Sequence, residues 1–299
     1  MRIKSHESVS RIKRFFYLWR LYRLVNSLLK RDLAEGDASG VDFSELPADN
    51  RKVLIVTIAF NNDAVLRHQI EHIRMFLQDN DVEYLVADNS PLKERQEVIR
   101  ALCEEMGVSY IKIPNDIRIN KISGSYSHGA AATWIYYNYI IKRRPYCFGF
   151  IDHDLFPIRQ FSIAEKLGDA PYYGFRDDRG GAWYLWMGLL FFKFAAVKDY
   201  EINFLPCKVN NGEVYLDTGG SLWYTLYSKL GSEGCNFPDR VVVPVYVNGK
   251  RYSDPIDYID DCWMHTNNGS NWKKKADKQD MLTIIWEKYQ NSIPDEIHF

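Results

Sequence analysis

The chain has 299 residues, of which 46% are hydrophobic and 26% charged. These proportions are typical of a globular protein and exclude disordered, collagen-like and disulfide-scaffold classes. The formal net charge of −1 hides an asymmetry: residues 1–31 carry nine lysines and arginines against one acid, whereas the other 268 residues hold 29 basic and 38 acidic side chains. An acidic body offers no basic stripe for phosphates, so we expect no nucleic-acid partner. The five cysteines lie at least 27 residues apart, which predicts reduced thiols in a cytoplasmic protein.

The first segment, 1–32, is predicted to form a basic amphipathic helix. Apolar side chains recur along it at helical spacing: Ile12, Phe15, Trp19, Tyr22 and Leu29. Arg20 and Arg23 interrupt the apolar run, so the segment is too polar to span a bilayer and lacks a signal-peptide core. Trp and Phe opposite Lys and Arg are typical of a helix on anionic lipid. We therefore expect a peripheral position on the inner face of the membrane; the alternative is a helix packed on the body.

Residues 33–50 are acidic and contain few large apolar side chains, which predicts a linker. From residue 51 apolar strands and amphipathic helices alternate. Strands are predicted at 52–60, 82–87, 108–113 and 146–151. Helices are predicted at 64–78, between the second and third strands with an end at 106, and at 127–141. This alternation predicts an α/β fold with a mostly parallel sheet flanked by helices. The apolar stretch 183–197 is too short to span a membrane and contains Gly188 and Lys193, so we expect a buried core segment.

Three predicted strands end in polar residues, at Asn61, Asp88 and Asp152. Ligands bind at the carboxyl ends of the strands in such sheets. In Asp152-His153-Asp154, two carboxylates one residue apart are spaced to converge on a hard divalent cation, which is commonly shared with diphosphate oxygens. The strand ends therefore predict a site for Mn²⁺ or Mg²⁺; the alternative is a solvated turn capped by aspartates.

At these positions the chain resembles nucleotide-sugar-dependent glycosyltransferases of the GT-A (Rossmann-like) fold, and is similar to the large inverting family of bacterial polysaccharide and lipopolysaccharide enzymes. The segments that carry the resemblance are 53–61, 84–90, 124–133, 150–154, 188–193, 216–222 and 263–270. It covers roughly residues 52–272. It implies one catalytic domain, 51–299, with a nucleotide-sugar-binding half at 51–160 and an acceptor-binding half at 161–299.

The resemblance also implies roles for individual residues. Contacts to a nucleoside-diphosphate sugar, with UDP favoured, are expected from Thr57, Ala59, Phe60, Asn61, Asp88, Asn89, Gly129, Asp152 and His153. The cation is expected to bind Asp152 and Asp154, with His265 completing the site. Asp217 stands where the family has the second of two acids, which deprotonates the acceptor hydroxyl; Leu216 replaces the first.

Each of these roles has a structural alternative. Asp217 would also serve as a helix N-cap, His265 as an ordinary loop histidine, and Asp88 as the cap of the turn that follows it. Trp183, Tyr184 and Trp186 would stack on a sugar acceptor, although core packing explains such aromatic residues equally well.

The sequence thus predicts a metal-dependent, inverting glycosyltransferase with Asp217 as general base, which acts on a glycan or lipid-linked acceptor in cell-surface polysaccharide synthesis. The alternatives are a non-catalytic sugar-nucleotide-binding scaffold and a metal-dependent hydrolase. His68-Gln-Ile-Glu71-His72 also matches a metallopeptidase pattern. On a helix, however, both histidines lie away from the apolar face, so we expect them on a solvated surface.

Overall fold

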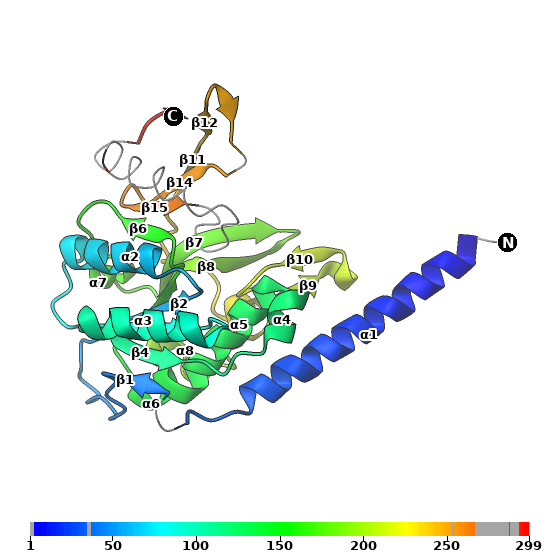
Figure 1. Cartoon of the computed structure of the whole chain (residues 1–299), viewed down its shortest axis with the longest axis horizontal. Helices are drawn as coiled ribbons and strands as arrows, with labels where there is room; N and C mark the ends of the chain where they lie inside the picture. Colours follow the sequence, from blue (N-terminus) through cyan, green and yellow to red (C-terminus); the bar gives the residue numbers. More distant parts are fainter. Residues whose placement is uncertain (1–2, 35–36, 253, 267–286, 288–292, 299) are drawn as a thin grey trace.

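The computed structural model describes residues 3–34, 37–252, 254–266, 287 and 293–298. Within these residues a seven-stranded sheet forms the centre of the molecule, in the order β1-β4-β3-β2-β5-β8-β7 (Figure 1). Its strands are β1 (Ala38–Ser39), β4 (Ser109–Lys112), β3 (Val82–Asp88), β2 (Val53–Ala59), β5 (Cys147–Ile151), β8 (Ala182–Lys193) and β7 (Tyr172–Arg179). The four strands β4, β3, β2 and β5 run parallel. β1 pairs antiparallel with β4, β8 pairs antiparallel with β5, and β7 pairs antiparallel with β8. The predicted α/β fold is confirmed.

Helices cover both faces of this sheet. Successive side chains of a strand point to opposite faces, and every side chain of β2 is buried, so both faces of the sheet must be packed. On one face, α2 (Asp63–Phe76) and α3 (Lys93–Glu105) pack over Ala59 and Val86. On the other, α5 (Gly124–Ile135) continues through a π-helical turn into α6 (Ile141–Arg143) and packs over Leu54 and Val56. The carboxyl ends of the parallel strands are thereby left open for a ligand.

A smaller sheet lies beside α2, in the order β11-β14-β15-β6. Its strands are β11 (Arg240–Val243), β14 (Ile256–Ile259), β15 (Trp263–Thr266) and β6 (Leu155–Pro157). It buries the polar side of α2: His72 is only 6% exposed and its Nδ1 lies 2.8 Å from the carbonyl oxygen of Pro157, and the His68 ring packs 5.4 Å from that of Phe156. The prediction that both histidines face solvent is therefore wrong, because a second sheet covers the helix face that the apolar pattern left free.

The helix α1 (Ile3–Leu29) packs against α5 and α4 (Ile117–Ile122). Leu21, Val25 and Leu28 form its buried face, whereas Trp19 and Tyr22, predicted on its apolar stripe, are 50% and 44% exposed. No helix in the described part of the chain is long and apolar enough to cross a membrane.

The acidic segment after α1 is attached to the domain in its described part. β1 pairs antiparallel with β4, and the Arg143 guanidinium donates to the carbonyl oxygen of Ser44 at 2.7 Å. The remaining elements are α7 (Ile163–Leu167), α8 (Phe194–Val197), β9 (Cys207–Val209), β10 (Val214–Leu216), the π-helical Trp223–Tyr227, α9 (Ser228–Leu230), β12 (Val245–Val247), β13 (Lys250–Arg251) and β16 (Ile297–His298). The stretch 183–197 is the buried strand β8 followed by α8, as predicted, and the five cysteines are free thiols.

Candidate functional site

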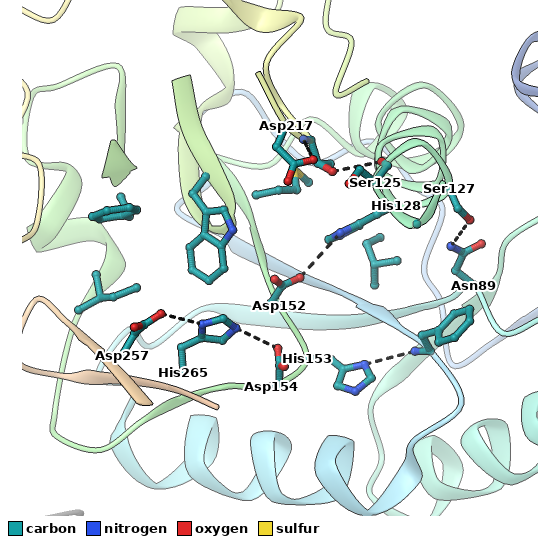
Figure 2. A pocket seen from close by; sticks show the side chains of 18 of the residues that line it. Asn89, Ser125, Ser127, His128, Asp152, His153, Asp154, Asp217, Asp257 and His265 are labelled. Carbon is teal, nitrogen blue, oxygen red and sulfur yellow. Dashed lines mark hydrogen bonds and ion pairs between the residues drawn. The ribbon is translucent and has the colours of Figure 1, made fainter. Parts of the chain in front are cut away.

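A cavity of about 580 Å³ lies at the carboxyl ends of the parallel strands, where the large and small sheets meet. Its size is in the range of small-molecule sites in proteins. The residues that line it come from the ends of β2, β3 and β5, from α4, the first turns of α5, β7, β8, the turn after β10 and the small sheet. They include Phe60, Asn89, Asn120, Ser125, Ser127, His128, Asp152, Asp154, Phe175, Trp186, Asp217, Arg240, Asp257 and His265. Figure 2 draws most of the side chains that line the cavity.

Two carboxylates and one imidazole converge at one end of the cavity. Asp152 and Asp154 occupy the turn between β5 and β6, and His265 lies on β15, which pairs with β6 so that His265 is opposite Leu155. One candidate ligand atom from each of the three residues falls within 4.8 Å of the other two, and His265 Nε2 lies 3.3 Å from Asp154 Oδ1. The three predicted metal-binding residues are thus together, although more than 100 residues separate His265 from the other two.

Asp257 of β14 orients His265 through the ring nitrogen that does not face Asp154. His265 Nδ1 lies 3.4 Å from Asp257 Oδ2 (Figure 2). Arg240 donates to the same carboxylate oxygen at 2.7 Å. Metal-binding histidines commonly have a carboxylate on the second ring nitrogen, which fixes the tautomer and the ring orientation. Burial lowers the pKa of His265, but Asp154 and Asp257 outweigh burial and raise this pKa to about 10. The donor set and its support fit a divalent cation such as Mn²⁺.

Asp152 faces a second histidine, His128 of α5, whose Nδ1 lies 3.8 Å from Asp152 Oδ1. Burial raises the pKa of the Asp152 carboxyl; the charge of His128 opposes this rise, and that of Asp154 adds to it. Asp154 is 5% exposed and Asp152 is partly exposed, and a divalent cation would offset the repulsion between the two carboxylates.

The turn that carries both aspartates is held by Gln69 of α2, which is fully buried. Its Nε2 donates to the carbonyl oxygens of Asp152 and Leu155, each at 2.6 Å. Its Oε1 accepts from the hydroxyls of Thr57 and Tyr84, each at 2.8 Å. All hydrogen-bonding positions of the amide are therefore used to join α2, two strands and the turn.

We expect Gln69→Leu to weaken Mn²⁺ binding by about tenfold or more, since supporting residues around metal ligands typically contribute that much. It should also lower the free energy of unfolding by about 2–4 kcal/mol, because several buried polar groups lose their partner. Titration with Mn²⁺ followed by electron paramagnetic resonance, and denaturation by urea, measure the two effects. Gln78→Leu is the control, because Gln78 is exposed and lies two residues after the end of α2. An unchanged Mn²⁺ affinity in folded Gln69→Leu would contradict the supporting role of Gln69.

His153, predicted to contact the donor, has a different position. It is 3% exposed, and its Nδ1 accepts from the backbone N–H of Phe60 at 3.2 Å. The neutral imidazole that this hydrogen bond requires agrees with burial, which lowers the pKa of His153. His153 borders the cavity but joins the aspartate turn to the end of β2, so the structure gives it a supporting position.

Asp217 lies on the other side of the cavity from Asp154 and His265 (Figure 2). Its backbone N–H donates to the Tyr184 hydroxyl oxygen at 3.3 Å, and its Oδ1 accepts from the Thr218 N–H at 2.8 Å. Thr218 in turn donates to the carbonyl oxygen of Ser125 in α5 at 3.1 Å. The carboxylate is half-buried and fixed against α5. Capping of its own turn, the alternative role, coexists with a position in the cavity wall.

Several residues predicted to contact the donor do not line the cavity. Thr57 and Ala59 are fully buried against α2 and α3, because the alternation of β2 directs Ile58 and Phe60 to the cavity instead. Phe60 lines the cavity, whereas the side chains of Thr57 and Ala59, which were expected to contact the donor, point away from it because they lie on the other face of the strand.

Asp88 is fully buried and holds the turn after β3. Its Oδ1 accepts from Ser90 N at 2.8 Å and its Oδ2 from the Tyr110 hydroxyl at 3.0 Å, and burial raises its pKa. The structure thus gives Asp88 the capping role, and the next residue, Asn89, lines the cavity and donates to Ser127 Oγ at 3.1 Å.

Asn61 and Gly129 are also outside the cavity lining. Asn61 adopts a left-handed conformation with φ 59°, and its N–H donates to Ser90 Oγ at 2.9 Å. A Cβ at Gly129 would lie 2.5 Å from the carbonyl oxygen of Phe204, so this glycine permits close packing of α5. The structure therefore gives Asn61 a place in the turn after β2 and Gly129 a place in the packing of α5.

Of the three aromatic residues predicted for the acceptor, Trp186 lines the cavity. Its ring lies 4.8 Å from that of His265, and it covers Gly188, where a Cβ would be 2.1 Å from the indole. Trp183 is 7% exposed and packs 4.7 Å from the Tyr227 ring, and Tyr184 is fully buried. For these two the core-packing alternative is correct.

Several lining residues were not predicted from the sequence: Asn120, Ser125, Ser127, His128, Arg240 and Asp257. Those at the start of α5 follow a predicted turn into a helix, and helix N-termini commonly face ligands at strand ends. Arg240 and Asp257 lie on β11 and β14 of the small sheet, and neither of these two strands carries a local motif.

No family model and no curated protein matches the chain. Among solved structures, it is similar to the mannosyltransferase PcManGT from Pyrobaculum calidifontis in complex with GDP-Man and Mn²⁺, at 14% identity and a TM-score of 0.35, over 63% of this chain and 55% of that one. The galactosyltransferase LgtC in complex with donor and acceptor sugar analogues matches at 17% identity and a TM-score of 0.35, over 50% of this chain and 60% of that one. The mannosyltransferase Ktr4p from S. cerevisiae matches at 8% identity and a TM-score of 0.32, over 60% of this chain and 65% of that one. The match spans less than two thirds of each of these chains. All three of these similar structures are glycosyltransferases.

Proposed function

We propose that this chain is a metal-dependent, inverting glycosyltransferase that moves a sugar from a nucleoside-diphosphate sugar to a glycan or lipid-linked acceptor in cell-surface polysaccharide synthesis. One observation carries the proposal: a single cavity holds a cation-binding set, Asp152, Asp154 and His265, at one end and the separate carboxylate of Asp217 at the other. Sugar transfer needs both, since charge develops on the departing diphosphate while the acceptor hydroxyl loses a proton.

At the donor end, the first turns of α5 face the cavity beside Asp152, with Ser127 and His128 in the lining. The N-terminus of a helix favours anions, which suits a diphosphate. A cation bound by Asp152, Asp154 and His265 supplies Lewis-acid stabilisation of the leaving group. Asn89 and Asn120 offer amide and carbonyl groups to the nucleoside, for which we propose UDP.

At the acceptor end, Asp217 accepts the proton of the attacking hydroxyl. Its hydrogen bonds to Tyr184 and Thr218 hold the carboxylate in the cavity wall, and Trp186 offers an aromatic face for a sugar ring. Since Asp217 and the cation-binding set lie on opposite sides of the cavity, attack on the face opposite the diphosphate inverts the anomeric carbon.

Thermal unfolding with UDP, GDP, CDP and dTDP, each with and without Mn²⁺, tests the proposal. A nucleotide at 100 times its dissociation constant stabilises the folded chain by about 2.7 kcal/mol, and we expect this for UDP only when Mn²⁺ is present. Failure of all four nucleotides to stabilise the chain would contradict the proposal. Incubation with the sugar derivative of the nucleotide that binds separates the alternatives. Binding of the nucleotide without release of the sugar would indicate a scaffold, and rapid transfer of the sugar to water would indicate a hydrolase.

We further propose that α1 places the protein on the inner, anionic face of a membrane. Its outward side carries Phe16, 61% exposed, and Trp19, 50% exposed, and the Arg23 guanidinium lies 4.8 Å above the Trp19 ring. Aromatic and basic side chains together on an exposed helix face support a position at a lipid interface.

Flotation with vesicles measures this binding. The full chain is expected to float with vesicles of phosphatidylcholine and phosphatidylglycerol and to remain behind with phosphatidylcholine alone. The double variant Phe16→Ser, Trp19→Ser should lose most of the binding, since each aromatic side chain contributes about 2 kcal/mol when buried in lipid. Val98→Ser, an exposed apolar residue of α3, is the control; equal flotation of the double variant and the control would refute the assignment.

A further inference from the structure

The exposed face of α1 reaches the acceptor side of the cavity. The Tyr22 ring is perpendicular to the Tyr126 ring at 6.2 Å, and Tyr126 lies on α5 between the cavity residues Ser125 and Ser127. The Tyr17 hydroxyl also donates to the carbonyl oxygen of Ile122 in α4 at 3.0 Å. Figure 1 shows α1 on the side of the molecule that carries α4 and α5. The helix is therefore fixed to the wall of the cavity that holds Ser125.

A second exposed aromatic residue continues this surface toward Asp217. Tyr215 on β10 is 39% exposed and stands two residues before Asp217. Burial and the charge of Asp217 raise the pKa of Tyr215 to about 12, whereas a hydrogen bond with Ser125 lowers it. Tyr126, whose ring contacts that of Tyr22, is 8% exposed, and the charge of Tyr215 adds to its raised pKa. The exposed Tyr22 on α1 and the exposed Tyr215 beside Asp217 therefore both lie near the start of α5.

Charge favours the same side of the molecule for a membrane. Residues 1–31 carry a net charge of +8, and the rest of the chain carries −9. An anionic bilayer attracts α1 and repels the acidic body, so the helix side turns toward the lipid. Arg20, Arg23, Lys30 and Arg31 are exposed on α1 and directly after it, where phospholipid headgroups can reach them.

We propose that α1 holds the Asp217 side of the cavity against an anionic phospholipid bilayer, and that the acceptor is lipid-linked and enters from that bilayer. This proposal rests on the proposed function for its acceptor, and on α1, Tyr22 and Tyr215 for its orientation. Confinement of enzyme and acceptor to one surface raises their effective concentration without a further binding contact. Of the two proposed acceptor classes, a lipid-linked glycan fits this arrangement and a soluble glycan does not need it.

The orientation is measured with a fluorescent label at each of two positions in the full chain. Tyr215→Cys labels the edge of the cavity, and Glu94→Cys labels the exposed side of α3 on the opposite face of the large sheet. Both are made with Cys207 and Cys235 replaced by Ser, because these two thiols are partly exposed. Vesicles of phosphatidylcholine and phosphatidylglycerol, with a nitroxide quencher on the lipid headgroup, provide the membrane. Lys208→Cys, opposite Tyr215 in the β9–β10 pair, replaces the first label position if that variant unfolds.

We expect several-fold stronger quenching at residue 215, or 208, than at residue 94. Equal quenching at both positions, stronger quenching at residue 94, or no vesicle binding would overturn the orientation. These outcomes do not depend on sugar transfer, so they are distinguishable from failure of the nucleotide and Mn²⁺ titration. With the donor that this titration identifies, the labelled sugar should appear in organic-extractable product when a bacterial total lipid extract is supplied; transfer to water-soluble glycans alone would overturn the lipid-linked acceptor.

Discussion

Asp154→Asn is expected to abolish Mn²⁺-dependent sugar transfer while the chain remains folded. Asp154 is 5% exposed and its Oδ1 lies 3.3 Å from His265 Nε2, so its carboxylate is central to the proposed cation site. Asparagine keeps the shape of the side chain but removes the negative charge. Loss of one preorganised electrostatic group typically lowers turnover by about 10²–10³-fold, and loss of a metal ligand should cost at least as much.

Initial rates over a range of Mn²⁺ concentrations measure this effect, and circular dichroism checks the fold. Asp199→Asn is the matched control, because Asp199 is an exposed carboxylate paired only with the neighbouring Lys198 among the described ion pairs. Turnover of Asp154→Asn at the wild-type rate in saturating Mn²⁺ would refute the metal assignment. Activity restored only by much higher Mn²⁺ would support it, since the remaining ligands would then bind the ion weakly.

Asp217→Asn is expected to lower turnover by about 10²–10⁴-fold, the usual contribution of a general base. Binding of nucleotide and Mn²⁺ should stay at the wild-type level, because Asp217 lies across the cavity from Asp154 and His265. The asparagine oxygen can still accept from the Thr218 N–H, so the turn keeps its hydrogen bond. The variant therefore separates catalysis from capping.

Turnover with saturating donor and acceptor, together with calorimetry of UDP binding in Mn²⁺, measures both properties. Asp199→Asn serves again as the control. A wild-type rate in Asp217→Asn would mean that Asp217 only caps its turn. Parallel loss of turnover and of nucleotide binding would indicate that the substitution disturbs the cavity as a whole.

The sequence was most informative where a property depends on neighbouring residues. The buried run at 52–60 and the amphipathic run at 64–78 became β2 and α2 with ends shifted by at most two residues. Of the three residues that the strand-end rule named, Asp152 lines the cavity, whereas Asn61 and Asp88 do not. The carboxylate of Asp88, and the side chains of Thr57 and Ala59 that the resemblance named, point into the core. A shift of one residue reverses the face of a strand, and the sequence pattern of a doubly buried strand contains no alternation that identifies the face.

By itself, the sequence determined the α/β fold, the order of its parallel strands along the chain and the aspartate pair at the end of β5. Only the tertiary structure decided which distant groups join that pair. The antiparallel pairing of β15 with β6 brings His265 to Asp154, β14 adds Asp257 behind it, and α2 supplies Gln69 beneath the turn. The packed face of α1 was decided in the same way, by Leu21, Val25 and Leu28 against α4 and α5. The physical reason is common to all of these: local patterns record how a segment divides between apolar and polar surroundings, whereas the register of one strand against another depends on contacts between residues far apart in the chain.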